Sequence, residues 1–507
     1  MTRPEKPRRS AKSGFDPFRL AEHGTNFRIE TFAGVTTFLT MSYIIFLQPA
    51  ILSGKMTGAP TNMDADAVMV ATCLAAALAT ALMGLLANLP IAQAPGMGQN
   101  FFFTVTVIPA AAAVAAVRGS EPWQVALGAV FLAGVIFLIL TLLGARRMIL
   151  RAFSPSLRNA IAVGIGLFIA LIGLKNAGIL VPDVKTDQGW LLTKHLATPD
   201  MAAFLFGLLV TAGLHARRIR GSILWGIVAT TALCYAFRMM TPLLPESVTG
   251  SSWLAQSQLM TWFQPAEAVF AAPPSIAPVF LKMDVIGAFC WQLAPMILVL
   301  VFMDVFDTLG TLIGVSEQAG LTRDGEIPRP GRAMMSDAIG TVAGAGLGTS
   351  TVTSYIESAA GVQQGGRTGL TALIVAALFL IAPIAAPIIQ MVGSYPAITA
   401  PALVIVAVMM MRCVTNIDWN DFTEAFPATL IIAGIPLTFS IADGLALGLF
   451  VYPIVKLLGG KWRSMSRSAL IVTGILALLI ASYFVWIRPM TLPPVKGETQ
   501  TTSVETE

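Results

Sequence analysis

The chain has 507 residues, of which 55% are hydrophobic and only 12% are charged. A soluble globular protein carries roughly 25% charged residues, so this composition excludes a soluble protein and indicates an integral membrane protein. Apolar stretches continue from about residue 30 to about residue 487 and leave no room for a sizeable soluble domain.

The predicted elements follow a basic, polar stretch at 1–28, which lacks the apolar core and cleavage site of a signal peptide and is expected to be a cytosolic tail. A bilayer core of about 30 Å requires roughly 20 apolar residues per helix. A further apolar run at 469–487 is either an additional span or part of a different division of the last segments, and a polar tail follows it at 489–507. In chain order the expected segments, about fourteen in all, are 30–52, 67–88, 94–117, 122–145, 158–180, 201–215, 221–240, 286–315, 333–347, 350–364, 368–392, 399–412, 425–440 and 442–458.

The distribution of Arg and Lys predicts the orientation, because short cytoplasmic loops hold an excess of both. With the N-terminus inside, even-numbered segments return to the basic clusters at 146–158, 217–220, 323–332 and 456–467. We therefore expect a multi-pass protein of the cell membrane with a cytoplasmic N-terminus. The long, arginine-poor loop at 241–285 is then extracytoplasmic. It separates two halves of about seven segments, so any duplication would be an inverted repeat, as in many secondary transporters.

Two stretches at matching places in the halves predict broken helices. The stretch 88–109 contains Pro90, Pro95 and Gly96 before a run of Phe, Thr and Val, and 340–366 mixes Gly, Thr, Ser and Val. Proline removes an amide donor and glycine frees the backbone, so continuous helices are not expected there. Lipid tolerates no unpaired backbone, so both breaks must be enclosed by protein or face a water-filled cavity. Their equivalent positions indicate a central binding site.

Acidic and amide side chains gather near these breaks. Asp304 and Asp307 are three residues apart in an apolar segment, a spacing that places both on one helix face. A carboxylate at mid-membrane costs roughly 2.5 to 3.5 kcal/mol on the translocon insertion scale, so this face is not expected to contact lipid. Asn100 lies in the first break, Glu357 follows the second, and Asp337 precedes it. These residues are the candidates for a site.

Structural roles remain open for most of them. Asp307 could cap a short helix or bond to a neighbouring threonine, and Asp337 could cap a helix at the membrane edge. Asn100 could tie off the backbone left by the proline break, and the phenylalanines at 101–103 could serve only in packing. Glu357 is hardest to explain in this way, because no Lys or Arg lies within about nine residues of it.

No metal site, cofactor or hydrolytic centre is expected. The histidines lie outside the spans or at their edges, and no His, Lys or Ser stands at a useful spacing from the acids for hydrolysis. The cysteines are scattered through apolar segments without paired spacing, so neither disulfides nor a zinc site are indicated. They are Cys73, Cys234, Cys290 and Cys413.

Four long motifs stand out in the sequence. They are NFRIETFAGVTTFLTMSYIIFLQPAILS at 26–53, APGMGQNFFFT at 94–104, FMDVFDTLGTLIGVSEQAGL at 302–321 and GTSTVTSYIESAAGVQQGGRTGLTAL at 348–373. These motifs closely resemble the AzgA-like purine permeases of the nucleobase:cation symporter-2 family. The resemblance covers about residues 26 to 460. It implies an all-α membrane protein of about fourteen segments in a 7+7 inverted repeat, with short antiparallel strands in segments three and ten.

The same resemblance implies a division into a core domain and a gate domain, with substrate held between segments three and ten near the gate. Members of the wider group are often dimeric through the gate, so a homodimer is a further implied partner. The implied divisions are 1–28, the basic tail; 29–150, the first stretch of the core; 151–240, the first stretch of the gate; 241–285, the extracytoplasmic loop; 286–395, the second stretch of the core; 396–488, the second stretch of the gate; and 489–507, the polar tail.

Carried over by position, the resemblance makes Asp304 and Asp307 the acids of segment eight, Glu357 the acid of segment ten and Asn100 the amide of segment three in a purine pocket. Asp337 falls where relatives of the wider group have an acid linked to transport. The chain departs from the expected pattern at Gln99, where we expect a more apolar residue. That departure concerns which purine the site prefers and leaves the class of transporter unchanged.

Purine chemistry fits these residues. Hypoxanthine and guanine present an N1–H donor, and guanine adds an amino group, so a carboxylate can accept both in a fork of charge-assisted bonds. We assign that fork to Glu357 and the opposite edge of the base to Asn100. Phe101, Phe306 and Tyr355 are candidates for stacking on the ring.

The acids also predict proton coupling. Asp304 and Asp307 are expected to share a proton and to titrate as a coupled pair, with Asp337 as a further coupling residue. Sodium is disfavoured because no larger oxygen-rich cluster is evident. The prediction is a proton-driven importer of adenine, guanine or hypoxanthine in which the core moves against the gate. An anion transporter on the same fold remains the alternative, and a channel is disfavoured because the polar residues gather at one depth.

Overall fold

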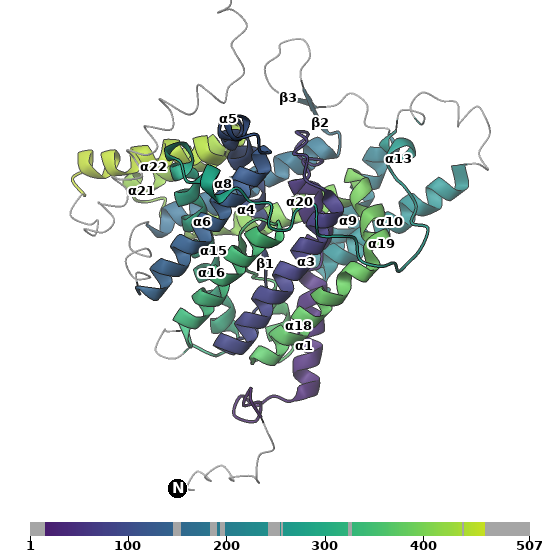
Figure 1. Ribbon diagram of the computed structural model, residues 1–507, viewed down its shortest axis with the longest axis horizontal. Helices are drawn as coiled ribbons and strands as arrows, with labels where there is room; N and C mark the ends of the chain where they lie inside the picture. Colours follow the sequence, from purple (N-terminus) through teal and green to yellow (C-terminus); the bar gives the residue numbers. More distant parts are fainter. Residues whose placement is uncertain are drawn as a thin grey trace, which may run out of the picture.

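The computed structural model describes residues 16–144, 154–182, 190–192, 198–241, 254, 257–322, 327–438 and 441–461. The apolar run at 469–487, the polar tail at 489–507 and most of the basic N-terminal tail lie outside these residues. Within them the chain is mostly helical, and ten helices are long and apolar enough to cross a membrane. Figure 1 shows the arrangement of these helices. Their length and apolar composition indicate an integral membrane protein, as the composition of the chain predicts.

The first half of the chain consists of helices and three short strands. Several helices begin at a capping side chain; Asn26 Oδ1, for example, accepts the Ile29 amide at 3.0 Å at the start of α1. The elements are α1 (Phe27–Met41), α2 (Ile44–Leu52), α3 (Ala65–Leu82), β1 (Gln93–Pro95), α4 (Met97–Phe102), α5 (Ile108–Arg118), α6 (Pro122–Leu142), α8 (Pro155–Asn176), β2 (Leu180–Pro182), β3 (Trp190–Leu192), α9 (Pro199–Ala216) and α10 (Ser222–Met240).

The second half repeats the pattern of long helices with one strand between them. Thr368, which precedes α18, accepts the Leu370 amide through its hydroxyl and caps that helix. The elements are α13 (Gln258–Thr261), α14 (Val285–Ala288), α15 (Ala294–Gln318), α16 (Pro330–Leu347), β4 (Val352–Ser354), α17 (Ser358–Val362), α18 (Gly369–Ile381), α19 (Ala386–Ser394), α20 (Pro396–Met411), α21 (Phe422–Thr438) and α22 (Ile441–Leu458).

The two predicted helix breaks meet in the middle of the molecule. β1 and β4 pair antiparallel, with Ala94 opposite Thr353. Each strand is buried along its length, so the free backbone of both breaks is enclosed by protein, as expected. The prediction of short antiparallel strands in segments three and ten is confirmed. The strand in the first break lies before the Phe, Thr and Val run, which is helical, because tertiary burial overrides β propensity there.

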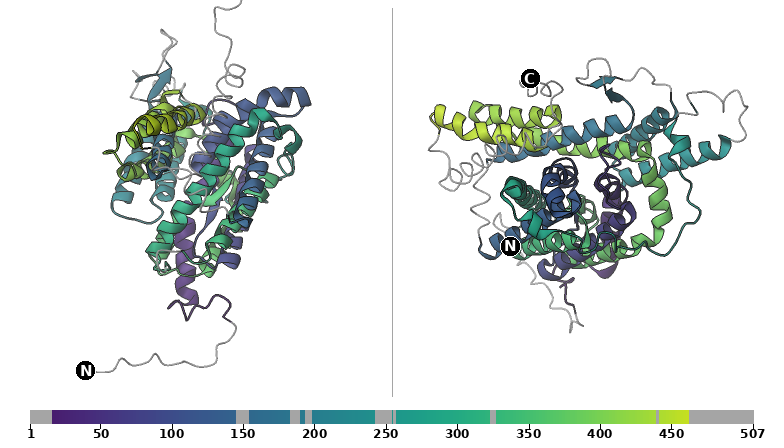
Figure 2. Two further views of the ribbon diagram at one scale, coloured as in Figure 1. Left: turned by 90° about the vertical axis from the view of Figure 1, so that its left-hand side faces the viewer. Right: turned by 45° about the horizontal axis from the view of Figure 1, so that its top comes forward.

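The described helices pack in two groups. Figure 2 shows α8, α20, α21 and α22 in a row beside the remaining helices. We call this row, together with α9 and α10, the outer group. The strand group contains β1 and β4 and the helices α1 to α6 and α15 to α18 that pack around them. The predicted boundaries of core and gate stay predictions, because packing alone does not show which regions move.

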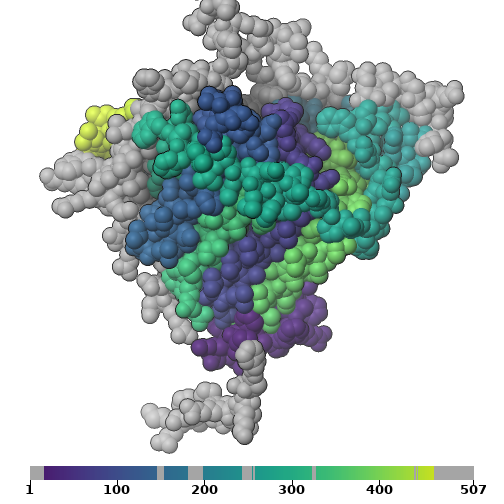
Figure 3. All heavy atoms as spheres, in the orientation of Figure 1, coloured from purple at the N-terminus to yellow at the C-terminus, as the bar shows by residue number. Residues whose placement is uncertain are grey.

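The chain between the halves is bound to the strand group. Leu281 donates its amide to Gly346 O at 2.8 Å, and Asp284 donates to Gln124 O at 2.8 Å. Figure 3 shows this stretch of the chain, in teal, lying across the face of the molecule above α3. It therefore covers the ends of α6 and α16 on the side that orientation predicts to be extracytoplasmic.

Fewer than the predicted fourteen segments of the described chain are helices long and apolar enough to cross a membrane. Ten of the expected segments are such helices. Four others are shorter or less apolar elements of the described chain, namely those expected at 333–347, 350–364, 425–440 and 442–458. These are α16, β4 with α17, α21 and α22. They occupy the expected places in the chain order, and the number itself stays a prediction.

Candidate functional site

A cavity of about 660 Å³ lies between the strand group and the outer group. From the strand group, Glu357, Asp307 and the strand residue Thr353 contribute to its wall. From the outer group, Arg158 of α8 and Arg412, which follows α20, line the same space. Binding pockets of small molecules have volumes of about 300 to 1,000 Å³ and few polar groups, and this cavity falls within that class.

Glu357 is held by a tyrosine from the first segment. It stands directly before α17, where the backbone leaves β4, and the Tyr43 hydroxyl donates to Glu357 Oε1 at 2.7 Å. Tyr43 lies between α1 and α2 and also lines the cavity. Close by, the Tyr355 hydroxyl donates to Pro95 O and its amide donates to Ala92 O at 2.9 Å. The acid is therefore presented from a backbone that side chains fix in place.

Asp307 is exposed to the cavity, whereas Asp304 is not. Gln99, at the start of α4, donates its amide to Asp307 Oδ2 at 3.2 Å. The residue that departs from the expected family pattern thus contacts a candidate acid directly. Phe306 lies beside Asp307 in the cavity wall, and the Arg158 guanidinium lies 5.6 Å from the centre of its ring. This contact joins the two helix groups across the cavity.

Asp304 and Asp337 lie behind the wall of the cavity, away from its lining. Asp304 is 1% exposed, and Thr341 donates to its Oδ2 at 2.9 Å. Its Oδ1 has no hydrogen-bond partner among the residues that the structure describes. Asp337 is fully buried and accepts from Gln93 Nε2 at 2.7 Å and from Thr308 Oγ1 at 2.6 Å. The two acids of segment eight therefore have different surroundings, although their spacing places both on one side of the helix.

Asn100 and Phe101 are also fully buried and lie outside the lining of the cavity. The Ser350 hydroxyl donates to Asn100 Oδ1, so this amide connects segments three and ten. The Phe101 ring packs edge-on against Phe168 of α8 with centroids 6.2 Å apart. Both side chains support the site from behind, and the structure brings neither of them to the cavity surface.

Several residues that line the cavity are not among the predicted site residues. The hydroxyl group of Tyr43 stands inside an apolar segment of the longest motif, which is a signal in the sequence that could have identified it. Arg158, which belongs to a basic cluster predicted to be cytoplasmic, and Arg412 both line the cavity. Cys413, for which neither a disulfide nor a zinc site is expected, also contributes to the wall. All four cysteines are free thiols.

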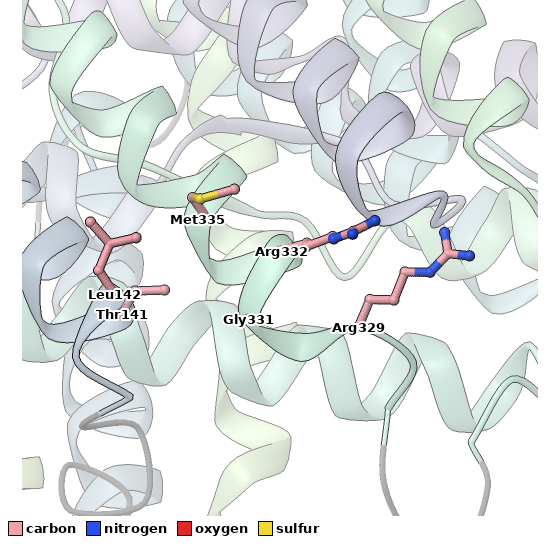
Figure 4. A pocket seen from close by; sticks show the side chains of 6 residues that line it. All are labelled: Thr141, Leu142, Arg329, Gly331, Arg332 and Met335. Atoms are coloured by element: carbon pink, nitrogen blue, oxygen red, sulfur yellow. The ribbon is translucent and has the colours of Figure 1, made fainter.

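A second hollow lies at the end of α6 and the beginning of α16 (Figure 4). It shares no lining residue with the cavity and contains none of the predicted site residues. Figure 4 shows the side chains of Arg329 and Arg332 extending away from Thr141 and Leu142. Within the described ranges, no group of three or more His, Cys, Asp or Glu side chains could hold a metal ion.

Known proteins match this chain along nearly its whole length. The sequence model of a permease family matches residues 28–447. A putative permease of Methanocaldococcus jannaschii is 44% identical over 93% of this chain and 98% of its own length. The adenine permease AdeP of Escherichia coli is 38% identical over 91% and 95%. The guanine/hypoxanthine permease PbuO of Bacillus subtilis is 38% identical over 88% and 95%.

Among solved structures, the transmembrane domain of the bicarbonate transporter BicA from a cyanobacterium is similar, with a TM-score of 0.56. The match covers 83% of this chain and 97% of that domain at 16% sequence identity. At this identity the likeness shows the fold alone. The shared architecture is a helical membrane transporter fold and is consistent with the predicted 7+7 repeat.

Proposed function

This chain belongs to the nucleobase:cation symporter-2 family of permeases, among its AzgA-like purine permeases, and we propose that it imports purine nucleobases together with protons. Membership of this family makes it a transporter and not an enzyme. Relatives that match along the whole chain are named for adenine or for guanine and hypoxanthine, which supports a purine substrate. We place the protein in the cell membrane with a cytoplasmic N-terminus, because its basic loops then face inward.

The observation that carries the proposal is the oriented carboxylate of Glu357 in the wall of a solute-sized cavity. Tyr43 occupies Oε1, which leaves the other carboxylate oxygen and a lone pair for the substrate. A lactam purine such as hypoxanthine or guanine presents N1–H to that carboxylate. Adenine lacks this donor, and a protonated Glu357 would match its N1 acceptor instead. The protonation state of one residue could therefore decide which purine binds.

The other side chains of the wall complete the binding site. We propose that Phe306 and Tyr355 contact the faces of the base, because both line the cavity and both are aromatic. Asp304, Asn100 and Phe101 are fully or almost fully buried behind the lining, so we assign them indirect roles. Asn100 would hold segment ten through Ser350, and Phe101 would support α8 through Phe168.

We further propose that transport moves the strand group, as the core, against the outer group, as the gate. The cavity lies between the groups, so such a movement would change the side from which it is reached. Asp307 would take up the coupling proton, because it is the acid of segment eight that is open to the cavity. Asp304 and Asp337 would contribute to coupling from behind the wall.

The test is uptake of radiolabelled hypoxanthine by cells that lack their own purine permeases, with adenine, guanine, xanthine and uracil as competitors. Glu357→Gln keeps the size of the side chain and removes its charge, so we expect uptake to fall by more than about tenfold at normal protein levels in the membrane. Collapse of the pH gradient at a fixed purine gradient should abolish accumulation. Uptake that ignores this collapse would refute the proton-driven mechanism.

One observation favours a second candidate, an anion transporter. Arg158 and Arg412 place two positive charges on the cavity wall, and the bicarbonate transporter of similar fold shows that this architecture accommodates anion transport. The two arginines share the cavity wall with Asp307 and Glu357, whose negative charges disfavour a bound anion. Uptake of labelled bicarbonate or chloride that purines do not inhibit would support the anion transporter and exclude our first proposal.

A further inference from the structure

A continuous line of side-chain oxygens leads from the cavity to the buried acid of α16. It starts at Thr353 of β4, which lines the cavity together with Asp307, passes through Thr308 of α15, and ends at Asp337. We propose that the hydroxyl groups of Thr353 and Thr308 form a relay that carries the coupling proton between Asp307 and Asp337. This inference rests on the proposed proton symport and specifies the route of the proton.

The contacts along this line are short. The Thr353 and Thr308 hydroxyl oxygens lie 2.9 Å apart, and Thr308 Oγ1 donates to Asp337 Oδ2 at 2.6 Å. At the cavity end, Asp307 and Thr353 line the same wall of the cavity. Thr308 is fully buried and Thr353 is 2% exposed, so bulk water does not compete for these bonds. Hydrogen-bonded oxygens at such distances are suited to proton transfer.

The donor directions are compatible with a relay toward Asp337. Thr308 donates to Asp337, so its oxygen can accept from Thr353, and Thr353 can then accept from a protonated Asp307. The Ser354 amide also donates to Thr308 Oγ1, at 3.3 Å, and keeps this oxygen in the acceptor position. All hydroxyl groups of the line are thus oriented in one direction.

The transfer is balanced. The carboxyl proton of Asp307 moves to the Thr353 oxygen, the hydroxyl proton of Thr353 moves to Thr308, and the hydroxyl proton of Thr308 moves to Asp337 Oδ2. Every O–H bond that breaks is replaced by one that forms. The net result is a deprotonated Asp307 beside the substrate and a neutral Asp337, and no electron or further reactant is needed.

Among the described residues, Asp337 takes part in none of the ion pairs. Asp304 and Asp307 of α15 are the charged groups that act on it most directly. Its remaining partner, Gln93 of β1, donates an amide hydrogen and holds the carboxylate without offering it a proton. Asp337 can therefore store a proton that arrives through Thr308.

The alternative is that Thr308 only anchors β4 to α15 and α16. Thr308→Val and Thr308→Ser separate these roles, because valine keeps the shape and removes the hydroxyl, whereas serine restores it. Thr72→Val is the matched control, since Thr72 is equally buried and donates to Val68 O of its own helix at 2.7 Å. Thr353→Val interrupts the same line at its other hydroxyl; because Thr353 also lines the cavity, only the ratio of proton influx to hypoxanthine uptake is compared for this variant.

The measurement uses protein in liposomes that contain a pH-sensitive dye. Hypoxanthine accumulation and proton influx are recorded under an imposed pH gradient, and counterflow of hypoxanthine is recorded without a gradient. A relay predicts that Thr308→Val lowers accumulation and proton influx by at least about tenfold, a lower bound beneath the roughly 100- to 10,000-fold that positioned proton-transfer groups contribute. Counterflow should remain within about twofold, and Thr308→Ser should restore the driven uptake.

Other outcomes overturn the relay in distinguishable ways. Unchanged accumulation and proton influx in Thr308→Val would eliminate the relay and leave proton symport intact. Equal losses of accumulation and counterflow in Thr308→Val, without rescue by serine, would assign the residue a purely structural role. If the unsubstituted protein transports hypoxanthine without any dependence on the pH gradient, proton symport itself fails and the relay fails with it.

Discussion

Tyr43→Phe tests whether Glu357 is positioned for the substrate before the substrate arrives. The substitution removes one oxygen atom and preserves the ring, so it eliminates the 2.7 Å bond to Glu357 Oε1 with little change in packing. Glu357 would keep its charge and its place in the chain. It would lose the contact that fixes its side-chain conformation in the cavity.

The size of the expected change in the KM for hypoxanthine depends on which hydrogen bonds already exist before the substrate binds. The Tyr43 bond is present before the substrate binds, so its own energy largely cancels between the free and bound states. What remains is the cost of immobilising a freed glutamate when the base binds, about 0.5 to 1.5 kcal/mol for a flexible side chain. This corresponds to an increase of about two- to tenfold in the KM for hypoxanthine. The maximal rate should change little, because Glu357 can still form its bonds.

The assay is hypoxanthine uptake over a range of concentrations, corrected for the amount of protein in the membrane. Tyr235→Phe is the matched control, because Tyr235 lies on α10 with 42% of its surface exposed and does not line the cavity. Tyr43→Phe combined with Glu357→Gln completes a double-mutant cycle. The effect of Tyr43→Phe should nearly disappear in the Glu357→Gln background, since both act through one carboxylate.

Two results would refute this reasoning. An unchanged KM in Tyr43→Phe, together with a large effect of Glu357→Gln, would mean that Tyr43 does not orient the acid. An increase of more than about a hundredfold would exceed the cost of ordering one side chain and would mean that Tyr43 contacts the base itself.

Three further changes probe the site and its supports. In Gly96→Ala the new Cβ would lie 2.0 Å from the Gln99 side-chain oxygen and 2.8 Å from Thr353 Cγ2, so both side chains must shift, Gln99 should leave Asp307, and uptake should fall at least about tenfold at unchanged protein level. In a variant that retains Cys413 as its only cysteine, saturating hypoxanthine should slow alkylation by a membrane-permeant maleimide, and an unchanged rate would place the substrate elsewhere. The hydrogen bond from Arg118 lowers the pKa of Asp284, so ionised Asp284 stabilises the fold above the carboxyl's unfolded pKa of about 3.9. The difference in Tm between the wild type and Asp284→Asn should therefore begin to shrink as the pH falls below about 4 and vanish only below the lowered pKa of Asp284.

The sequence alone determined the class of protein and the position of the breaks in its helices. Composition and the length of apolar runs are local quantities, and lipid imposes them on every spanning helix. The strand β1 lies at the first break because Pro95 cannot donate an amide bond and Gly96 has no side chain that would favour a continuous helix, and β4 lies in the stretch of Gly, Thr, Ser and Val at the second break. The motifs, being long, also identified the family. None of these conclusions required knowledge of which residues touch.

Only the tertiary structure decided which candidate residues share the cavity. Asp304 and Asp307 lie less than one helical turn apart. Asp304 nevertheless accepts a hydrogen bond from Thr341 of α16 and is buried, whereas Asp307 lines the cavity. Tyr43 and Glu357 are 314 positions apart and meet only after α1, α2 and β4 pack together. Side-chain contacts over such separations depend on the relative placement of whole helices, which local patterns do not encode.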